Sequence, residues 1–428
     1  MNIGIIGTGV TGLTAGYELA KKGHKVTLFE AEDNLGGLVS TLKVGELKVE
    51  KCYHHIFTSD TEVIELAKEL GLSKELLWKT PSNGVFMNHT IYPFSTPLDL
   101  LNFRELSFIN RIKMGMLVFK AKKINNWKEL EYLTSKQWII QNSNKTVYEN
   151  MWEPLLNSKF DFDSEKISAV WIWNKFKLRG STRSKSMSKE LLGYMNNSFG
   201  LLYKRLADVI VNNGGRIFLS TRVNKIKVKE NETIDLITES EALNFDKVIF
   251  TAAPSLLKEM DMNLNYDYLE KIDKIKYKSN ICMMLELKEQ LSPYYWVTIA
   301  DKSYPFVLLI EHTNLIQEEK YKSHIVYLSR YLDENHEINS YSEEKIKELF
   351  IEYLQKMFPN WSSEQIINTH LYKFKYAQPV ITKEYSKVLP EYNTPIKNLY
   401  LASMAQIYPE DRGQNYAIKM GKEVAKLI

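Results

Sequence analysis

Three glycines near the start of the chain have the spacing of a turn that binds a pyrophosphate. They are Gly7, Gly9 and Gly12. The first allows a tight turn, the second lets the backbone approach the phosphates, and the third lets a helix pack closely on a strand. Glu30 follows at the place where an acid can accept hydrogen bonds from a ribose diol. Together with the adjacent residues, these positions predict a dinucleotide site: Val10, Thr11 and Ala31.

This chemistry requires a strand, a helix and a second strand around the glycines. Asn2 to Ile6 is nearly continuous in apolar residues, which is typical of a buried parallel strand. Leu13 to Lys22 predicts a helix that Gly23 ends, and Lys25 to Phe29 predicts the second strand. The helix N-terminus offers unpaired N–H groups and a partial positive charge to phosphates. The sequence therefore predicts a Rossmann-type unit.

A second glycine pair distinguishes between the possible dinucleotides. Gly36 and Gly37, followed by Leu38, resemble the pair that follows the acid in FAD-binding flavoproteins. Those proteins carry an arginine where this chain has Asn34, which weakens one expected phosphate contact. Glu30 also disfavours NADP, because the carboxylate would repel the ribose phosphate. FAD is therefore the expected cofactor.

Two adjacent histidines, His54 and His55, interrupt an otherwise apolar stretch that ends at Phe57. One interpretation is structural, with one imidazole solvated and the other bonded in the core. The other is that one imidazole lies against the flavin and takes part in catalysis, since an unperturbed imidazole titrates near pH 6.5. We favour His55 for that role, because it would share a strand face with Phe57.

A second set of catalytic candidates lies far along the chain. Glu311 and His312 follow a predicted strand, Phe306 to Ile310, and fit either a capped turn or a site. Arg330 lies just beyond the next predicted strand and joins them as the alternative to the two adjacent histidines. No metal is expected, because Cys52 and Cys282 are too few for a thiolate site or a disulfide framework.

Length and composition limit the remaining possibilities. With 428 residues the chain is long enough for two domains, since one core seldom grows past about 250–300 residues. A net charge of +4 without a dense basic tract argues against nucleic-acid binding. No apolar run reaches the roughly 18 residues that span a bilayer. Two cysteines fit a reducing, cytoplasmic setting, and Met1 leads directly into a core strand, so no signal peptide is expected.

The order of predicted strands and helices indicates an α/β protein whose cofactor domain is interrupted twice. We expect the cofactor domain to comprise residues 1–77, 198–256 and 385–428, and an α+β substrate domain to comprise 78–197 and 257–384. A loop that opens the last helix can bind pyrophosphate as the first one does. The later cofactor segments supply the other expected FAD contacts: Val223, Ala252, Arg412, Gly413, Asn415 and Tyr416.

Two stretches between these segments have unusual compositions. Phe108 to Ile124 mixes apolar and basic residues, which fits either a core-packed helix with a solvated face or a helix in a membrane interface. We favour the core-packed helix and leave peripheral membrane contact open. The polar and basic run from Ser181 to Ser188 predicts a mobile loop or the edge of a lid. Nothing in the sequence indicates the oligomeric state.

Taken together, these motifs resemble the flavin amine oxidase and protoporphyrinogen oxidase superfamily, which includes phytoene desaturases and UDP-galactopyranose mutases. The likeness is most specific at Gly7 to Gly37, Phe199 to Pro254 and Leu399 to Gly421. It implies an FAD domain assembled from three separated segments, with a substrate domain inserted over the flavin. It also implies non-covalent FAD, because the cysteine near the C-terminus that holds covalent FAD in amine oxidases is missing here.

The resemblance also implies a reaction. A hydride would pass from a C–N or C–C bond of a bulky small-molecule or lipid-linked substrate to flavin N5, with oxygen, a quinone or another protein accepting the electrons. His54-His55-Ile56-Phe57 is similar to a stretch of the mutases. A non-redox flavoenzyme acting on a sugar nucleotide or a lipid-linked sugar is therefore the second hypothesis. A flavin-binding protein without turnover is the third.

Overall fold

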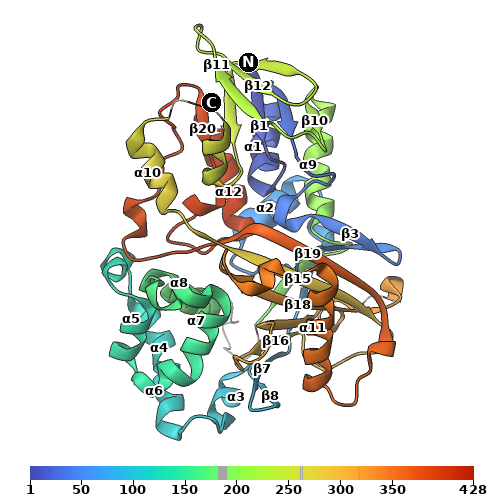
Figure 1. Ribbon diagram of the computed structural model, residues 1–428, viewed down its shortest axis with the longest axis vertical. Helices are drawn as coiled ribbons and strands as arrows, with labels where there is room; N and C mark the ends of the chain where they lie inside the picture. Colours follow the sequence, from blue (N-terminus) through green and yellow to red (C-terminus); the bar gives the residue numbers. More distant parts are fainter. Residues whose placement is uncertain (182–189, 261, 263, 318) are drawn as a thin grey trace.

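The computed structural model describes residues 1–181, 190–260, 262, 264–317 and 319–428. Apart from Ser181 itself, the predicted loop from Ser181 to Ser188 lies outside these residues. The molecule is elongated, and both termini lie at one end of its long axis (Figure 1).

A five-stranded parallel sheet forms the end that carries the termini (Figure 1). β1 and β2 are joined by α1 (Val10–Lys21), as the glycine spacing predicts. β14 and β20 reach the same sheet from distant parts of the chain, which confirms the Rossmann-type fold assembled from three separated segments. In spatial order the strands are β10 (Arg216–Phe218), β2 (Lys25–Phe29), β1 (Asn2–Ile6), β14 (Lys247–Phe250) and β20 (Leu399–Leu401).

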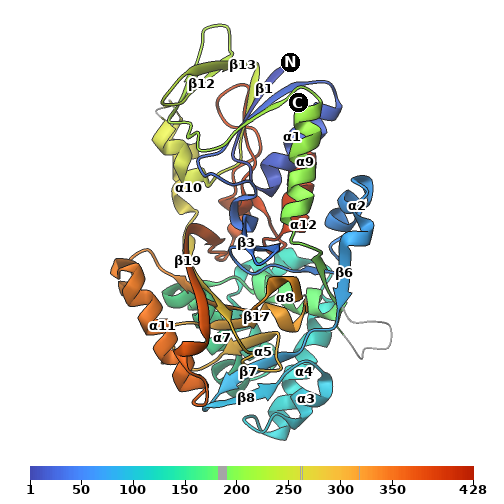
Figure 2. The ribbon, with the colours of Figure 1, turned by 90° about the vertical axis from the view of Figure 1, so that its right-hand side faces the viewer.

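Three helices pack together beside this sheet: α1, α9 (Gly200–Asn212) and α12 (Gln414–Val424) (Figure 2). A Cβ on Gly421 of α12 would lie 2.7 Å from the Thr11 carbonyl oxygen, so the glycine allows α12 to approach α1 closely. Near the other end, the Lys22 ammonium donates to the Ala425 carbonyl at 2.6 Å. The two helices therefore run in the same sense, with both N-termini directed toward the middle of the molecule.

A small antiparallel sheet precedes β14, and it corrects one expectation. The sequence predicts a single strand from Phe245 to Pro254, but the chain turns at Asp246. The Asp246 N–H donates to the Asn2 carbonyl at 2.9 Å, and the Asp246 carboxylate accepts from the Asn2 N–H at 2.7 Å. This clamp ends the antiparallel sheet and starts the parallel strand. The antiparallel strands are β11 (Lys225–Val228), β12 (Ile234–Ile237) and β13 (Ala242–Phe245).

A seven-stranded sheet occupies the other half of the molecule, and α11 (Glu343–Met357) covers one of its faces (Figures 1 and 2). All neighbours are antiparallel except β16 and β7. In order the strands are β19 (Ile366–Pro379), β15 (Tyr277–Leu287), β18 (His324–Leu332), β17 (Leu308–Glu311), β16 (Trp296–Ile299), β7 (Asn83–Met87) and β8 (Thr90–Pro93).

Helices between residues 97 and 181 form a separate layer with an aromatic core. Trp138, Trp152, Trp171, Trp173 and Phe176 are buried in that core. The helices are α3 (Pro97–Asn102), α4 (Phe108–Lys123), α5 (Ser135–Asn142), α6 (Lys145–Val147), α7 (Glu153–Phe160) and α8 (Ala169–Ser181).

Two further small sheets connect the halves. One is a hairpin around Gly45, formed by β3 (Thr41–Val44) and β4 (Leu47–Glu50). The other contains β5 (Ile56–Phe57), β9 (Leu192–Met195) and β6 (Leu76–Lys79). The helix after β5 is α2 (Thr61–Glu69), while α10 (Tyr266–Lys274) lies beside the parallel sheet (Figure 1).

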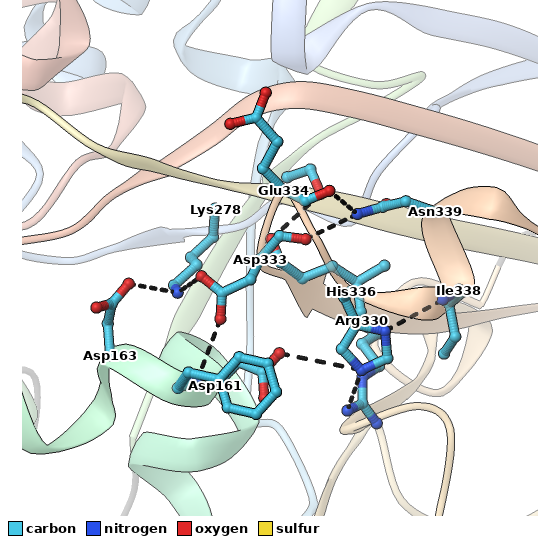
Figure 3. A network of polar contacts seen from close by, with 12 residues as sticks. Asp161, Asp163, Lys278, Arg330, Asp333, Glu334, His336, Ile338 and Asn339 are labelled. Carbon is cyan, nitrogen blue, oxygen red and sulfur yellow. Dashed lines mark hydrogen bonds and ion pairs between the residues drawn. The ribbon is translucent and has the colours of Figure 1, made fainter. Parts of the chain in front are cut away.

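A buried ion cluster attaches the helical layer to the seven-stranded sheet (Figure 3). Lys278 of β15 is fully buried, and its ammonium donates to Asp163 at 2.7 Å and to Asp333, which follows β18. Asp333 also accepts from the Phe162 N–H at 3.2 Å. Because Asp163 and Phe162 belong to the turn after α7, the cluster fixes that helix to the sheet.

Candidate functional site

The two glycine turns meet at the end of the parallel sheet. Gly7 has a φ of +102°, and a Cβ on Gly12 would lie 2.1 Å from the Gly7 carbonyl oxygen, so neither position accepts a side chain without a shift. The Gly36 N–H donates to the Thr8 carbonyl at 2.9 Å. A Cβ on Gly37 would lie 3.4 Å from the Gly9 Cα. The predicted pair Gly36–Gly37 is therefore placed directly against the first glycine turn.

The N-terminus of α1 at this turn is open to a ligand, and so is the N-terminus of α12. A Cβ built on Gly9 or on Gly413 meets no protein atom within 4 Å. These glycines are the N-caps of α1 and α12, and neither helix has a side-chain cap or an acid in its first turn. The first N–H groups of a helix have no partner within the helix and attract anions. The turn therefore fits a pyrophosphate.

Glu30 follows β2 and is only partly engaged by the protein. One carboxylate oxygen accepts from the Thr8 N–H at 2.9 Å and from the Thr8 hydroxyl at 2.7 Å, and the other accepts from the Glu32 N–H at 3.1 Å. A carboxylate can accept about four hydrogen bonds. The second oxygen therefore keeps capacity for a ribose hydroxyl.

The other expected cofactor residues occupy varied positions. Val10 and Thr11 lie buried in the first turn of α1, Val223 is buried, Leu38 and Ala252 are half-buried, and Ala31 is exposed. Their contact with a nucleotide stays a prediction.

The last predicted segment contributes both structural and site residues. Asn415 accepts from the Glu62 N–H at 2.8 Å, so this side chain anchors the start of α2. Tyr416, next along α12, is half-buried. Arg412 donates to Gln378 and to the Tyr331 hydroxyl, both at 2.7 Å. The Tyr331 hydroxyl in turn lies 3.5 Å from the Tyr53 hydroxyl, which brings the start of α12 next to the histidine stretch.

His54 has a defined tautomer. Its Nδ1 lies 2.7 Å from the Cys52 carbonyl oxygen, which can only accept, so Nδ1 carries the proton. Burial lowers the pKa of His54 to about 4, and the nearby Arg412 cation acts in the same direction. At neutral pH the imidazole is therefore uncharged, with the Nε2 lone pair as an acceptor.

His55 is held among aromatic side chains. Its Nδ1 lies 3.0 Å from the Tyr295 hydroxyl, and its ring contacts those of Phe57 at 5.3 Å and Trp296 at 5.6 Å between centroids. The contact with Phe57 agrees with the expectation that both lie on one side of the strand. The two histidines bond to different partners, and which of them meets a ligand stays a prediction.

A cluster of charges lies next to this stretch, around Asp411. The Asp411 carboxylate accepts from the Trp171 indole N–H at 3.1 Å and from Lys175, and Lys159 lies 3.8 Å away. Burial alone would raise the pKa of Asp411, but Lys175, Lys159 and Arg412 hold it well below its usual range. Burial lowers the pKa of Lys159, and the cations of Lys175 and Arg412 reinforce this against the opposing Asp411. The amino groups of Lys159 and Lys175 and the guanidinium of Arg412 thus surround one carboxylate.

Glu311 and His312 lie in the core, at the end of β17. The Glu311 carboxylate accepts from the N–H groups of Leu291 and Ser292 at 2.9 and 3.0 Å, which fixes that loop. Burial raises the pKa of Glu311 to about 7. His312 lies 3.4 Å from the Tyr321 hydroxyl, and burial lowers its pKa to about 4. These contacts favour anchoring roles, and catalytic roles for both residues stay predictions.

Arg330 belongs to the polar network of Figure 3 rather than to the histidine stretch. Its guanidinium donates to the Tyr304 carbonyl at 3.0 Å and lies 3.3 Å from His336. In the described ranges, no group of three or more histidine, cysteine or acidic side chains could hold a metal ion.

Comparison with known proteins identifies the relatives of this chain. The family model described as flavin-containing amine oxidoreductase matches residues 10–428. The chain belongs to this family. The flavin-containing amine oxidoreductases are oxidoreductase enzymes, so the chain is a flavin-dependent oxidoreductase, and its mixed α/β fold is the one expected.

Individual relatives of this family are distant but cover almost the whole chain. The 15-cis-phytoene desaturase of Glycine max is 23% identical over 430 residues, 94% of this chain and 75% of that protein. The mitochondrial protoporphyrinogen oxidase of Nicotiana tabacum is 23% identical over 93% of this chain and 88% of that protein. The structure of an oxidoreductase from Methanosarcina mazei matches with a TM-score of 0.76, covering 100% of both chains at 16% identity, which shows the shared fold.

Several residues of the site were not foreseen from the sequence. Lys159, Lys175 and Asp411 carry no local motif, and Tyr295 and Tyr331 belong to ordinary strand patterns. The only available signal was the position of Asp411, which lies in the loop before α12 that the sequence predicts to bind the cofactor. The pairings that bring the others together are long-range contacts, which periodicity cannot reveal.

Proposed function

We propose that the chain binds FAD non-covalently and oxidises a C–N or C–C bond of a bulky, partly apolar substrate. The observation that carries the proposal is the glycine turn, which is open at Gly9 before the uncapped N-terminus of α1. The uncapped N-terminus of α12 is likewise open at Gly413. Glu30 supports FAD over FMN, because a carboxylate beside the turn matches the ribose of an adenosine half.

The cysteines support non-covalent binding. Cys282 is buried in β15, where burial and the adjacent Cys52 raise the pKa of its thiol. The thiolate is the nucleophilic form of cysteine, so this thiol is poorly suited to a bond with a flavin. Cys52, half-buried, has its sulfur 4.0 Å from the Asn280 side-chain oxygen.

The two adjacent histidines can position a substrate and move a proton. When bound, a flavin accepts a hydride at N5. His54 offers Nε2 as an acceptor, so it can take a hydrogen bond or a proton from an N–H or O–H of the substrate. Tyr295 holds the other imidazole, that of His55, which also packs against the rings of Phe57 and Trp296.

The charge cluster supports a substrate with an anionic group. Lys175 and Arg412 carry two positive charges against the single charge of Asp411, beside the histidine stretch, and the amino group of Lys159 lies with them. A carboxylate or phosphate would balance the remaining charge and form charge-assisted hydrogen bonds with the two lysines. Both small molecules and lipid-linked substrates can carry such a group.

One experiment tests the cofactor and the reaction together. We expect purified protein to be yellow, and acid to release FAD from it in stoichiometric amount. Anaerobic addition of a substrate should bleach the flavin, and admission of oxygen should restore the colour if oxygen is the acceptor. Release of FMN, or flavin bound covalently after acid treatment, would contradict the cofactor assignment. Turnover that needs pre-reduced flavin but consumes no electrons would instead support a mutase-type reaction, which the similarity at His54 to Phe57 suggests.

A further inference from the structure

We propose that α3 and α4 form a docking surface for an anionic lipid bilayer. The two helices lie at the end of the molecule opposite the termini (Figures 1 and 2). Sixteen large apolar side chains are exposed among the described residues, and seven of them fall between residues 98 and 119, about a twentieth of the chain. They are Leu98, Leu101, Phe108, Ile109, Ile112, Met116 and Phe119, each 43–65% exposed. We call these residues the apolar stripe.

The stripe is a second apolar face of α4. Met114, Leu117 and Ala121 are buried and form the face that packs on the helical layer. Ile109, Ile112, Met116 and Phe119 recur at intervals of three and four residues, so they share one face of the helix. At about 100° per residue this face lies opposite the buried one. The helix is thus packed on the core with an exposed outer face, as we favoured, but much of that outer face is apolar.

Basic residues flank the stripe. α4 contains Arg111, Lys113, Lys120, Lys122 and Lys123 and no acidic residue. Arg111 and Lys120 donate to backbone carbonyls of Leu106 and Asn142, and in the described part of the chain none of the five forms an ion pair. Lys113 and Lys120 lie on one side of the stripe, and Arg111 and Lys122 on the other, as the helical repeat places them.

This combination selects an anionic membrane as the occupant. Apolar side chains can enter the boundary between headgroups and acyl chains, while flanking lysines extend toward lipid phosphates. A second copy of the same surface would bring five unpaired cations against five others, so a symmetric dimer is disfavoured. No helix among residues 1–181, 190–260, 262, 264–317 and 319–428 is long and apolar enough to cross the bilayer, so the proposed contact is peripheral.

Cosedimentation of the full chain with vesicles tests the proposal. We expect binding to vesicles of phosphatidylcholine with 30% phosphatidylglycerol, partial release by 0.5 M NaCl, and at least tenfold weaker binding to phosphatidylcholine alone. The double variant Ile109→Ser/Phe119→Ser should bind anionic vesicles at least tenfold more weakly. The double variant Lys122→Gln/Lys123→Gln should lose most of the salt-sensitive part.

Matched variants distinguish docking through the apolar stripe from non-specific binding of exposed apolar side chains to vesicles. Tyr266 and Ile367 are 79% and 45% exposed outside the stripe, so Tyr266→Ser/Ile367→Ser should bind like the unaltered chain. All variants should keep their flavin content and melting temperature, because the replaced side chains are exposed. Three results would overturn the proposal: no binding to anionic vesicles, equal loss in the Tyr266/Ile367 control, or a dimer in solution that dissociates when the stripe is replaced.

Discussion

Gly9 differs from the other glycines of the cofactor turn because nothing in the protein opposes a side chain there. Its backbone is extended, with φ −64° and ψ 176°, which any residue can adopt. A substitution at Gly9 is therefore compatible with folding, whereas one at Gly12 would force a clash with the Gly7 carbonyl. This difference allows the ligand site to be tested without disturbing the fold.

We expect Gly9→Val to give folded but colourless protein, because the valine methyl groups would fill the space for the phosphates. Absorbance near 450 nm and the melting temperature check this. Gly115→Val, at an equally open glycine in α4, is the control and should keep its flavin. Full flavin occupancy in Gly9→Val would remove the main support for the assignment.

The adjacent histidines are expected to affect rate more than stability. At least one of His54→Ala and His55→Ala should retain FAD and near-normal melting, yet slow flavin reduction by roughly a hundredfold or more. Stopped-flow measurement of flavin bleaching checks this. Because the pKa of His54 lies at about 4, the rate should show no step near pH 6.5 arising from His54. Wild-type rates in both variants would show that the pair is structural.

The cation cluster leads to a prediction about substrate affinity. Replacing Lys159 by methionine keeps the length of the side chain and removes the amino group that would donate to the substrate. We expect Lys159→Met to raise KM for an anionic substrate by about tenfold or more, because a charge-assisted hydrogen bond contributes about 1.5–3 kcal/mol. KM for the corresponding uncharged ester should change far less. Equal changes for acid and ester would indicate that Lys159 only maintains the packing against Trp171 and Tyr331.

Buried His312 should make the free energy of unfolding depend on pH. Burial lowers its pKa from 6.5 to about 4, so its contribution is present above pH 6.5 and is lost as pH falls toward 4. The shift corresponds to the order of 3 kcal/mol. Glu50 and Glu311, whose pKa values burial raises to about 7, act in the opposite sense. The difference between His312→Gln and the wild type therefore separates the contribution of His312 to the pH dependence from those of the two glutamates.

Urea unfolding between pH 4 and 7 measures this contribution. We expect the loss of unfolding free energy below pH 6.5 to be smaller in His312→Gln than in the wild type. His89, which is exposed, provides the control, and His89→Asn should follow the wild-type curve. Parallel curves for His312→Gln and the wild type would mean that His312 is not neutral and buried in solution.

At the scale of helices and strands, the sequence predicted those elements whose structure is decided by residues close together in the chain. The glycine spacing predicted the β1–α1–β2 unit, because its contacts are short-range. The parallel pairing of β16 with β7 joins strands some two hundred residues apart, and no local pattern reports it. The sequence also could not tell which face of α4 points outward. Apolar residues lie on both faces, so the helix lacks the usual contrast between an apolar and a polar side.

The same limit explains what was missed in the candidate site. Gly7, Gly9, Gly12 and Glu30 could be recognised because the chemistry of a pyrophosphate turn requires adjacent residues. Asp411 and Lys159 act through side chains brought together by the packing of α7 against the start of α12. Their residue types are common on protein surfaces, so sequence alone gives no reason to single them out.

The buried ammonium of Lys278 is expected to hold the helical layer in place. Lys278→Met would leave two carboxylates, Asp163 and Asp333, without their shared partner, and removal of one partner of a buried pair costs about 3–5 kcal/mol. We expect a large fall in melting temperature. Proteolysis should then begin between α7 and α8 before it reaches the parallel sheet. The triple variant Lys278→Met/Asp163→Asn/Asp333→Asn should recover much of the loss, and failure to recover would point to packing rather than charge.

At the scale of the whole molecule, the cofactor turn depends on both ends of the chain. α12 lies against α1, and β20 completes the sheet that begins with β1. The seven-stranded sheet is similarly shared, since β7 and β8 come from residues 83–93 and the other strands from 277–379. Each half therefore requires segments on both sides of the other, which makes separate folding of the two halves unfavourable.

This interleaving has a consequence for synthesis on the ribosome. β1 pairs with β14, and the stretch from Gly7 to Asp246 separates them. At about 5–20 residues per second, the partner strand emerges roughly 12–50 seconds after β1. During that interval the edge of β1 that will pair with β14, Ile3 to Ile6, has no partner strand. Nascent chains of this protein should therefore bind ribosome-associated chaperones until translation passes β14. When those chaperones are depleted, chains that end before β14 should aggregate more than chains that include it.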